Sequence, residues 1–452
     1  MTIQKPLSII IALIALFTTT IVNGQTLLDN DQNMFKVSGY LRTGLGYSEG
    51  GETQAHFQVP GALNKYSLGN QADTYGELEF DYTYYLNDDK TKSIDAVWMT
   101  SIYEDFGTEN HMSFNFTEQL YLRANNLLGF NESIWVGNRF YDRRAIHMLD
   151  RQWINPGQKG WGAGVENLLN NGGDEDIKVG VWQFKDRDVK SYSNGLIGDL
   201  TNYTIDARLV NKPIAETVNI NFALNYSLRA QNEALGYSRE DGYGAFVWAD
   251  YKKESITNTT ALLYRQGANV SVDHWSGTSV RENPLGDNLV LNNLAKGYSF
   301  EVNNDFLYDD KDKFAINAIF MFVARNYGTT PYSLENNTPV YQLDKGNMFY
   351  WVSGAARAMY YVTNKLRPTL EYSYEYGNNE QLGAKGNLNK ITLTPELTLK
   401  KGYYYRPVVR PFVTYAFWSD GFKGLVGTTP NGAPFADKNS GFTCGVQFEI
   451  WW

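Results

Sequence analysis

The final twelve residues of the chain alternate between apolar and polar side chains. Every second residue of 442–452 is apolar, and the residues between them are polar or glycine until Trp451, an aromatic residue on the polar face. A period of two residues is that of a β-strand with two different faces. Such a strand, ending on an aromatic residue, is typical of the closing strand of an outer-membrane β-barrel. The alternative is a half-buried strand of a soluble sandwich.

The first 24 residues have the features of a secretory signal peptide. Lys5 supplies a positive charge, 7–17 is apolar except for Ser8, and small and polar residues lead to Gly24. The apolar run is too short to span a bilayer as a helix. We therefore expect residues 1–24 to be a signal peptide and residues 25–452 to form a single domain.

Composition agrees with a membrane barrel and excludes other classes. Aromatic residues make up 15% of the chain while the mean hydropathy is only −0.41, as expected when half of each strand faces water. The net charge of −9 argues against a nucleic-acid partner. The single cysteine, Cys444, excludes an internal disulfide and a cysteine-based metal site, and the four histidines show no metal-ligand spacing. We expect no cofactor.

Segments with a period of two residues recur along the whole chain. About eighteen are predicted, at 36–47, 72–86, 91–104, 114–128, 132–142, 160–170, 176–186, 202–212, 218–230, 243–253, 257–267, 297–308, 313–326, 349–362, 366–378, 388–400, 404–418 and 440–452. Short and long gaps alternate between them. This pattern predicts an 18-stranded antiparallel transmembrane β-barrel with short periplasmic turns, long extracellular loops and a water-filled lumen.

Aromatic residues occur on the polar, lumen-facing sides of several predicted strands. They are Tyr40, Tyr75, Phe246, Trp351, Trp418 and Trp451. A sugar ring has an apolar C–H face that can stack on an aromatic ring and a rim of hydroxyls that charged side chains can bind. A line of such sites would bind each sugar weakly and release it, as conduction requires. The alternative is that these aromatics are structural.

The segment of about 142–160, after the fifth predicted strand, mixes apolar and charged residues. Its first part reads DRRAIHMLDRQW from Asp142 to Trp153. A solvated loop would be more uniformly polar, so we expect this segment to fold into the barrel and narrow it. The alternative is an external loop packed on its neighbours.

The chain resembles the maltoporin family over its whole mature length. The resemblance is carried by segments that include 39–42, 74–78, 139–143, 147–150, 162–167 and 449–452. It implies an outer-membrane homotrimer of a Gram-negative bacterium that passes maltodextrins or other oligosaccharides. It also implies an aromatic "greasy slide" at Tyr40, Tyr75 and Trp451, with Phe246 and Trp351 aligned less directly, and a polar track at Arg42, Glu77, Arg143 and Asp150.

The chain departs from the family pattern at four polar positions. Ser67 and Thr117 stand where basic residues are expected, Ala145 replaces an acidic residue, and Gln152 replaces a tyrosine. Because specificity rests on such polar partners, the preference for maltodextrins stays open.

Three other functions were weighed against a sugar channel. One is a general diffusion porin without a sugar site, and another is a phage or adhesion receptor built on the long loops. An enzyme is disfavoured because Glu77 and Glu79 lie two apart on one strand face, too close to attack a glycosidic bond from opposite sides.

Overall fold

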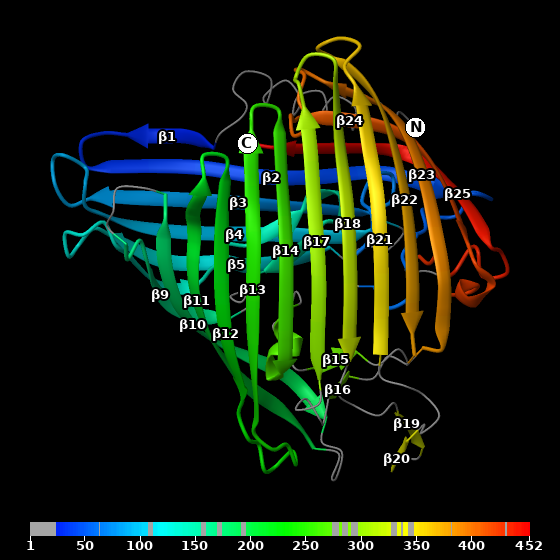
Figure 1. The fold of residues 1–452 in the computed structure, drawn as a ribbon, viewed down its shortest axis with the longest axis horizontal. Coiled ribbons are helices and arrows are strands. Elements are labelled where there is room, and N and C mark those ends of the chain that lie inside the picture. The colour runs from blue at the N-terminus through cyan, green and yellow to red at the C-terminus, as the bar shows by residue number, and fades with distance from the viewer. Residues whose placement is uncertain are drawn as a thin grey trace, which may run out of the picture.

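The predicted strands close into one antiparallel barrel in a computed structural model of the chain (Figure 1). The structure describes residues 24–62, 64–106, 112–154, 160–169, 174–190, 196–273, 280–282, 288–290, 297–326, 332–335, 338–341, 348–380, 382–429 and 432–452. The first 23 residues of the expected signal peptide therefore lie outside the described residues.

Eighteen strands make up the barrel within the described residues, so the predicted fold class is confirmed. Their bounds are β2 (Asn33–Ser48), β3 (Asp73–Tyr85), β4 (Ser93–Asp105), β5 (Ser113–Asn125), β6 (Ser133–Asn138), β9 (Trp161–Glu166), β10 (Asp176–Lys190), β11 (Ile197–Ala215), β12 (Val218–Arg229), β13 (Glu240–Lys253), β14 (Ile256–Gly267), β17 (Tyr298–Asp309), β18 (Phe314–Asn326), β21 (Met348–Tyr360), β22 (Leu366–Asn379), β23 (Ala384–Thr398), β24 (Val408–Trp418) and β25 (Ser440–Trp451). Each strand pairs with the next one in this list.

The barrel closes where β25 pairs with β2. The register places Trp451 opposite Tyr40 and Thr443 opposite Ser48. A short additional strand, β1 (Gln25–Asp29), pairs with the start of β2 beyond the end of β25. Closure leaves no exposed sheet edge along the seam, which is the condition for a sheet that crosses a membrane.

The alternation of side chains along the strands sorts them into an outer and an inner face. On β22, Leu370 and Tyr372 are 49% and 45% exposed on the outer surface, whereas Glu371 and Ser373 between them are fully buried inside. β25 follows the same rule, with Phe442 and Val446 outside and Glu449 inside. The apolar faces therefore form the outer wall and the polar faces surround the lumen, as the sequence predicts.

Several connections differ from the sequence prediction. The predicted long gap at 379–387 is only the four residues 380–383, because β22 and β23 continue further than their apolar alternation does, and the predicted gap at 187–201 shortens to 191–196. The last predicted strand but one was expected to start at residue 404, but β24 begins at Val408. The connection 399–407 is consequently longer than expected, and its side chains reach the lumen.

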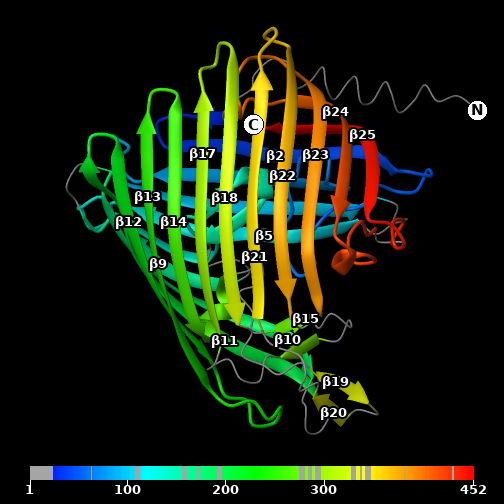
Figure 2. The ribbon, with the colours of Figure 1, turned by 45° about the vertical axis from the view of Figure 1, so that its right-hand side comes forward.

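Strands on opposite walls of the barrel cross one another in the side views (Figures 1 and 2) because the strands of a barrel tilt relative to its axis.

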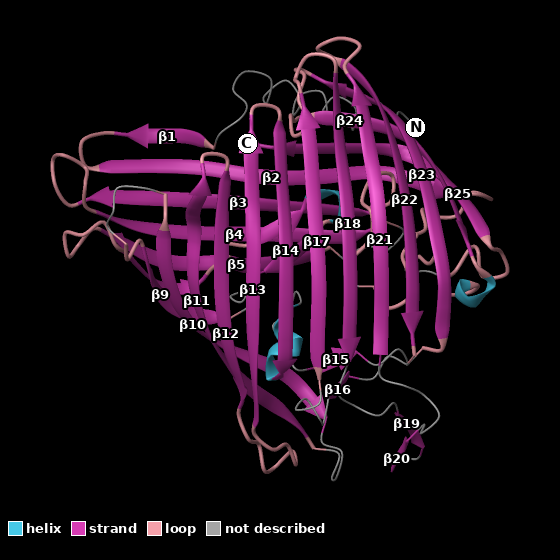
Figure 3. Cartoon of the chain, in the orientation of Figure 1, coloured by secondary structure: helices cyan, strands magenta, loops and turns pink. Residues whose placement is uncertain are grey.

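Among the described residues the helices are short 3₁₀ turns, drawn in cyan (Figure 3), and no helix is long and apolar enough to span a bilayer. The remaining described elements are η1 (His147–Leu149), η2 (Ala268–Asp273), η4 (Asp420–Phe422), β7 (Arg144–Ile146), β8 (Arg151–Ile154), β15 (Val280–Glu282), β16 (Asn288–Val290), β19 (Tyr332–Glu335) and β20 (Thr338–Tyr341).

Candidate functional site

A cavity of about 690 Å³ lies in the lumen against the inner faces of β2, β3 and β25. It brings together most of the site residues predicted from the sequence, namely Tyr40, Arg42, Tyr75, Glu77, Arg143, Asp150 and Trp451. Two predicted residues, Phe246 and Trp351, do not line it. Two chain segments that enter the barrel complete its wall.

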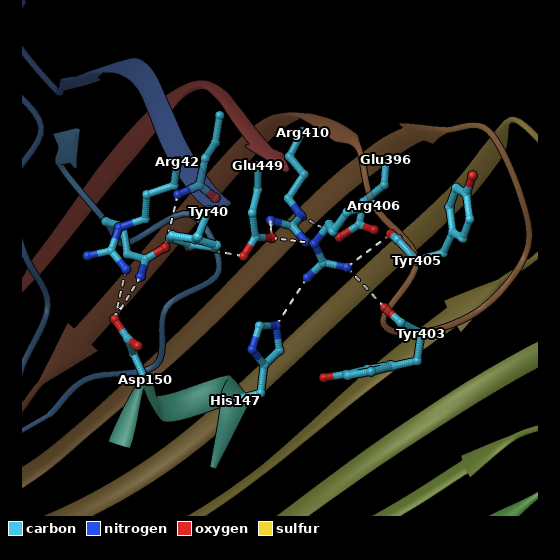
Figure 4. A network of polar contacts seen from close by, with 12 residues as sticks. Tyr40, Arg42, His147, Asp150, Glu396, Tyr403, Tyr405, Arg406, Arg410 and Glu449 are labelled. Atoms are coloured by element: carbon cyan, nitrogen blue, oxygen red, sulfur yellow. Dashed lines mark hydrogen bonds and ion pairs between the residues drawn. The ribbon is translucent and has the colours of Figure 1, made fainter. Parts of the chain in front are cut away.

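The first of these segments is the inner loop, which we define as residues 139–154 between β6 and the end of β8. Arg42 on β2 donates from Nη1 to Oδ2 of Asp150 at 2.8 Å (Figure 4). On the opposite side Arg151 forms a buried ion pair with Glu301 on β17, and Nε and Oε1 are 3.2 Å apart. The inner loop is thus held by charged pairs to two different walls. Residues 155–159 of the predicted 142–160 segment lie outside the described residues.

Several apolar side chains of the inner loop pack into a buried cluster inside the barrel. Met148 and Trp153 belong to a buried cluster that also contains Phe246 and Trp351. Phe246 is only 4% exposed and Trp351 only 1%. The strand alternation correctly placed both rings on the inner face, but it carries no information on what covers that face. The structure therefore assigns these two rings to packing, not to the cavity wall.

The second segment is the first loop, which we define as residues 49–72 between β2 and β3. Nζ of Lys390 donates to the carbonyl oxygen of Leu68 at 2.9 Å, and the hydroxyls of Tyr66 and Ser353 are 2.5 Å apart. Asn70 closes the loop on itself by donating to the carbonyl oxygen of Phe57 at 2.8 Å. The sequence predicted an inward position only for the inner loop, and the inward position of the first loop was not predicted.

Three aromatic rings follow one another along the cavity wall. The ring centroids of Tyr75 and Tyr40 are 6.0 Å apart, and those of Tyr40 and Trp451 are 6.3 Å apart. Tyr40 donates its hydroxyl hydrogen to Glu449 at 3.2 Å, and Tyr75 donates to Glu77 at 2.5 Å. These bonds hold the rings in place on an otherwise charged wall.

The row continues towards the connection 399–407. The imidazole of His147 is 6.0 Å from Trp451 and 5.5 Å from Tyr404, measured between ring centroids. Tyr404 is 45% exposed. Tyr404 was not predicted because the sequence pattern places residues 404–418 in one strand; the three consecutive tyrosines at 403–405 were the available signal.

Ion pairs organise the polar part of the wall. Arg42 lies between Asp73, at 2.7 Å, and Asp150. Glu449 accepts from both Arg406, at 2.6 Å, and Arg410, at 2.5 Å (Figure 4). Carboxylates and guanidinium groups that hold each other in this way present fixed donors and acceptors to whatever occupies the cavity.

Positive and negative side chains are balanced around the cavity. The lining cations are Arg42, Lys65, Arg143, Arg357 and Arg410, and the lining carboxylates are Asp73, Glu77, Glu118, Asp150 and Glu449. Of the four positions that depart from the family pattern, Ser67 and Gln152 line the cavity. An uncharged polar solute fits such a wall better than a strongly anionic or cationic one.

His147 holds the tip of the inner loop as a neutral acceptor. Its Nε2 lies 3.1 Å from Nη2 of Arg406, and a guanidinium can only donate, so the imidazole accepts through Nε2. Burial, assisted by Arg406 and opposed by Glu449, lowers the pKa of His147 from 6.5 to about 4. A proton on this ring would face the guanidinium directly.

We therefore expect acid to loosen the inner loop. The undocked imidazole takes up a proton below its ordinary pKa, so docking should be fully favourable above about pH 6.5 and weaken as the pH falls towards 4. Open-channel conductance in a planar bilayer should change across this window. His147→Gln, which keeps an acceptor oxygen but does not titrate, should flatten the profile. Superimposable profiles for the two proteins would contradict this role for His147.

No metal centre is apparent in the parts of the chain that the structure describes, where no group of three or more His, Cys, Asp or Glu side chains could hold an ion. The cavity chemistry consists of aromatic rings, hydrogen-bond donors and acceptors.

Comparison with known proteins places the chain in a family. The family model for the LamB porins matches residues 35–452. The chain belongs to the LamB porin family. As a member it is an outer-membrane β-barrel protein of a Gram-negative bacterium and a porin of the sugar-channel type. The family consists of channels, not enzymes.

Several solved structures are similar to the chain over most of its length. A complex of OmpF from Salmonella typhi with daunomycin shares 11% identity, with 94% of this chain and 99% of that chain covered and a TM-score of 0.45. The outer membrane protein opdK from Pseudomonas aeruginosa shares 11% identity, with 92% and 99% covered and a TM-score of 0.44. OmpT from Vibrio cholerae, an outer membrane protein, shares 9% identity, with 94% and 100% covered and a TM-score of 0.43.

Proposed function

We propose that the chain mediates facilitated diffusion of neutral oligosaccharides, maltodextrins foremost, across the outer membrane. The observation that carries this proposal is the row of Tyr75, Tyr40 and Trp451 on the wall of a cavity whose other side chains are mostly charged or polar. Each ring offers a stacking surface for one sugar. The polar residues of the track offer donors and acceptors to its hydroxyls.

The proposed role of each polar-track residue follows from the hydrogen-bond donors or acceptors that it keeps available to a sugar. Arg143 lies over the ring of Phe140, with its Cζ 3.9 Å from the centroid, which leaves its donors available to solute hydroxyls. Arg42 and Asp150 hold each other and present their remaining edges to the cavity. Glu77 accepts from Tyr75 and has a second oxygen for a sugar hydroxyl. Many weak contacts of this kind allow a solute to move on.

The aromatic path in this proposal runs from Tyr75 through Tyr40 and Trp451 to Tyr404. Phe246 and Trp351 are left out of it because both are buried under the inner loop. A homotrimer in the outer membrane, in contact with its lipid, is part of the proposal on the strength of the family. A phage or adhesion receptor role would use long loops such as 268–297 and 327–347, most of whose residues lie outside the described ones.

Liposome swelling tests the transport proposal. Vesicles containing the purified porin should swell in maltose, maltotriose and longer maltodextrins faster than expected for sugars of equal size diffusing through a simple pore. Raffinose and sucrose of comparable mass serve as references. Rates that depend on solute mass alone, with no preference among sugars, would favour the general diffusion porin.

A further inference from the structure

Lys65 stands out among the cations that line the cavity. It belongs to the first loop, is half-buried, and lines the same cavity as Tyr40 and Tyr75. Within the described residues its ammonium has no hydrogen bond and no ion pair, although Asp73 and Asp150 are near enough to act on its charge. A lysine that lies in a cavity wall without a fixed partner can donate its hydrogen bonds to a solute.

The other lining cations each have a fixed partner, which is a carboxylate or, for Arg143, a ring that leaves the guanidinium donors free. Arg42 pairs with Asp73 and Asp150. Arg357 pairs with Glu371, and Arg410 pairs with Glu396 and Glu449. Arg143 lies over an aromatic ring. Among the described residues, Lys65 is therefore the lining cation with neither an ion pair nor a ring contact, so the three donors of its ammonium stay available.

The residues on either side of Lys65 are fixed to the rest of the barrel. Asn64 donates from Nδ2 to the carbonyl oxygen of Asp150 at 3.0 Å and accepts from Nη1 of Arg151 at 3.2 Å. Tyr66 is joined to Ser353 across the lumen at 2.5 Å. The chain at residue 65 is thus held from both sides. The side chain of Lys65 can therefore change its conformation to meet a solute while the backbone beside it stays fixed.

We propose that Lys65 contacts the solute and helps to determine which sugars the channel prefers. Its ammonium donates to the hydroxyl and ring oxygens of a sugar stacked on Tyr40 or Tyr75, from the side of the first loop. This inference deepens the proposed function and rests on it. Asn64 acts as the positioning residue, because it ties the first loop to the inner loop beside the lysine.

The test compares sugar block of the ion current in a planar bilayer for the parent, Lys65→Met and Lys65→Arg. A hydrogen bond from a charged donor is lost in Lys65→Met, so the binding constant for the best-binding sugar should fall roughly 5- to 20-fold. Lys65→Arg should retain most of the binding. Lys438→Met, which removes an exposed lysine paired with Glu49, should leave binding unchanged.

A chemical rescue distinguishes contact from a structural role. Lys65→Cys is made in a Cys444→Ser background, which removes the single native cysteine. An aminoethyl methanethiosulfonate reagent then restores an ammonium at position 65 in the assembled channel. Sugar block should return after modification, and bound sugar should slow the reaction. A neutral methyl reagent of the same type should not restore block.

The outcomes separate this inference from the proposed function. Saturable sugar block in the parent that is equally strong in Lys65→Met and in unmodified Lys65→Cys overturns the role of Lys65 and leaves the sugar channel intact. Rescue by the neutral reagent as well as by the charged one would make the side chain a spacer and would also overturn it. Absence of block in the parent itself would remove the proposed function and this inference together.

Discussion

Replacing Arg151 by methionine should release the inner loop from the barrel wall, widen the channel and weaken sugar binding. Arg151 is 1% exposed and forms an ion pair with Glu301, which is fully buried. Removing one partner of a buried pair leaves the other charge uncompensated, at a cost of about 3–5 kcal/mol. The barrel is closed by the pairing of β25 with β2, whereas Arg151 belongs to the inner loop, so the cost should fall on the docking of the loop.

Single-channel conductance is the measurement for Arg151→Met. It should rise above that of the parent, become noisier as the loop moves, and show little block by sugars. The matched control is Arg151→Met with Glu301→Met, which removes both charges of the pair and should recover part of the parental conductance. Equal conductance and equal block in the parent and the single variant would mean that the inner loop does not narrow the channel.

Removing the rings of Tyr40 and Tyr75 together should have the second large effect. Stacking on one aromatic ring contributes on the order of 0.5–1.5 kcal/mol, taking aromatic pairs as a guide. Each ring then corresponds to about 2- to 12-fold in the binding constant of a sugar, and the two effects should multiply where one sugar chain spans both rings. The double alanine variant should lose sugar block while its open conductance stays the same or rises.

Two controls make this result specific to stacking. Tyr40→Phe with Tyr75→Phe keeps both rings and removes only the hydroxyls that bond to Glu449 and Glu77, so it should retain most of the binding. Trp98→Ala removes a ring of the outer wall, where Trp98 stacks on Phe80 at 5.2 Å, and should leave sugar block unchanged. Full block in the double alanine variant would show that these rings are structural.

The barrel and its two faces were predictable from the sequence because the signal is local. Alternation along a strand determines which side chains share a face, and residues such as Glu371 and Tyr372 lie where it places them. Tyr40, Tyr75 and Trp451 came together in the cavity for the same reason, since β2, β3 and β25 are neighbours in a closed sheet. The alternation of side chains along each strand and the closure of the sheet were sufficient to predict where these residues lie.

The positions that could not be predicted from the sequence depend on contacts between segments that are distant in the chain and meet in the lumen. Alternation placed Phe246 and Trp351 inside, but the inner loop covers them, and no pattern within their strands reports that. The first loop has no regular period, and its inward position depends on Lys390 from a strand more than three hundred residues away. Lys65 and Tyr404 became candidates only once these long-range contacts placed their segments inside the barrel.

Titration of maltodextrins of increasing length against the ion current of the unaltered channel in a planar bilayer shows whether the lumen binds sugars. If the rings and the polar track form a row of sugar sites, the current should be blocked saturably. The binding constant should increase with chain length until the sugar spans the path from Tyr75 to Tyr404. A current that falls only slightly and linearly with sugar concentration, equally for every sugar, would contradict the account.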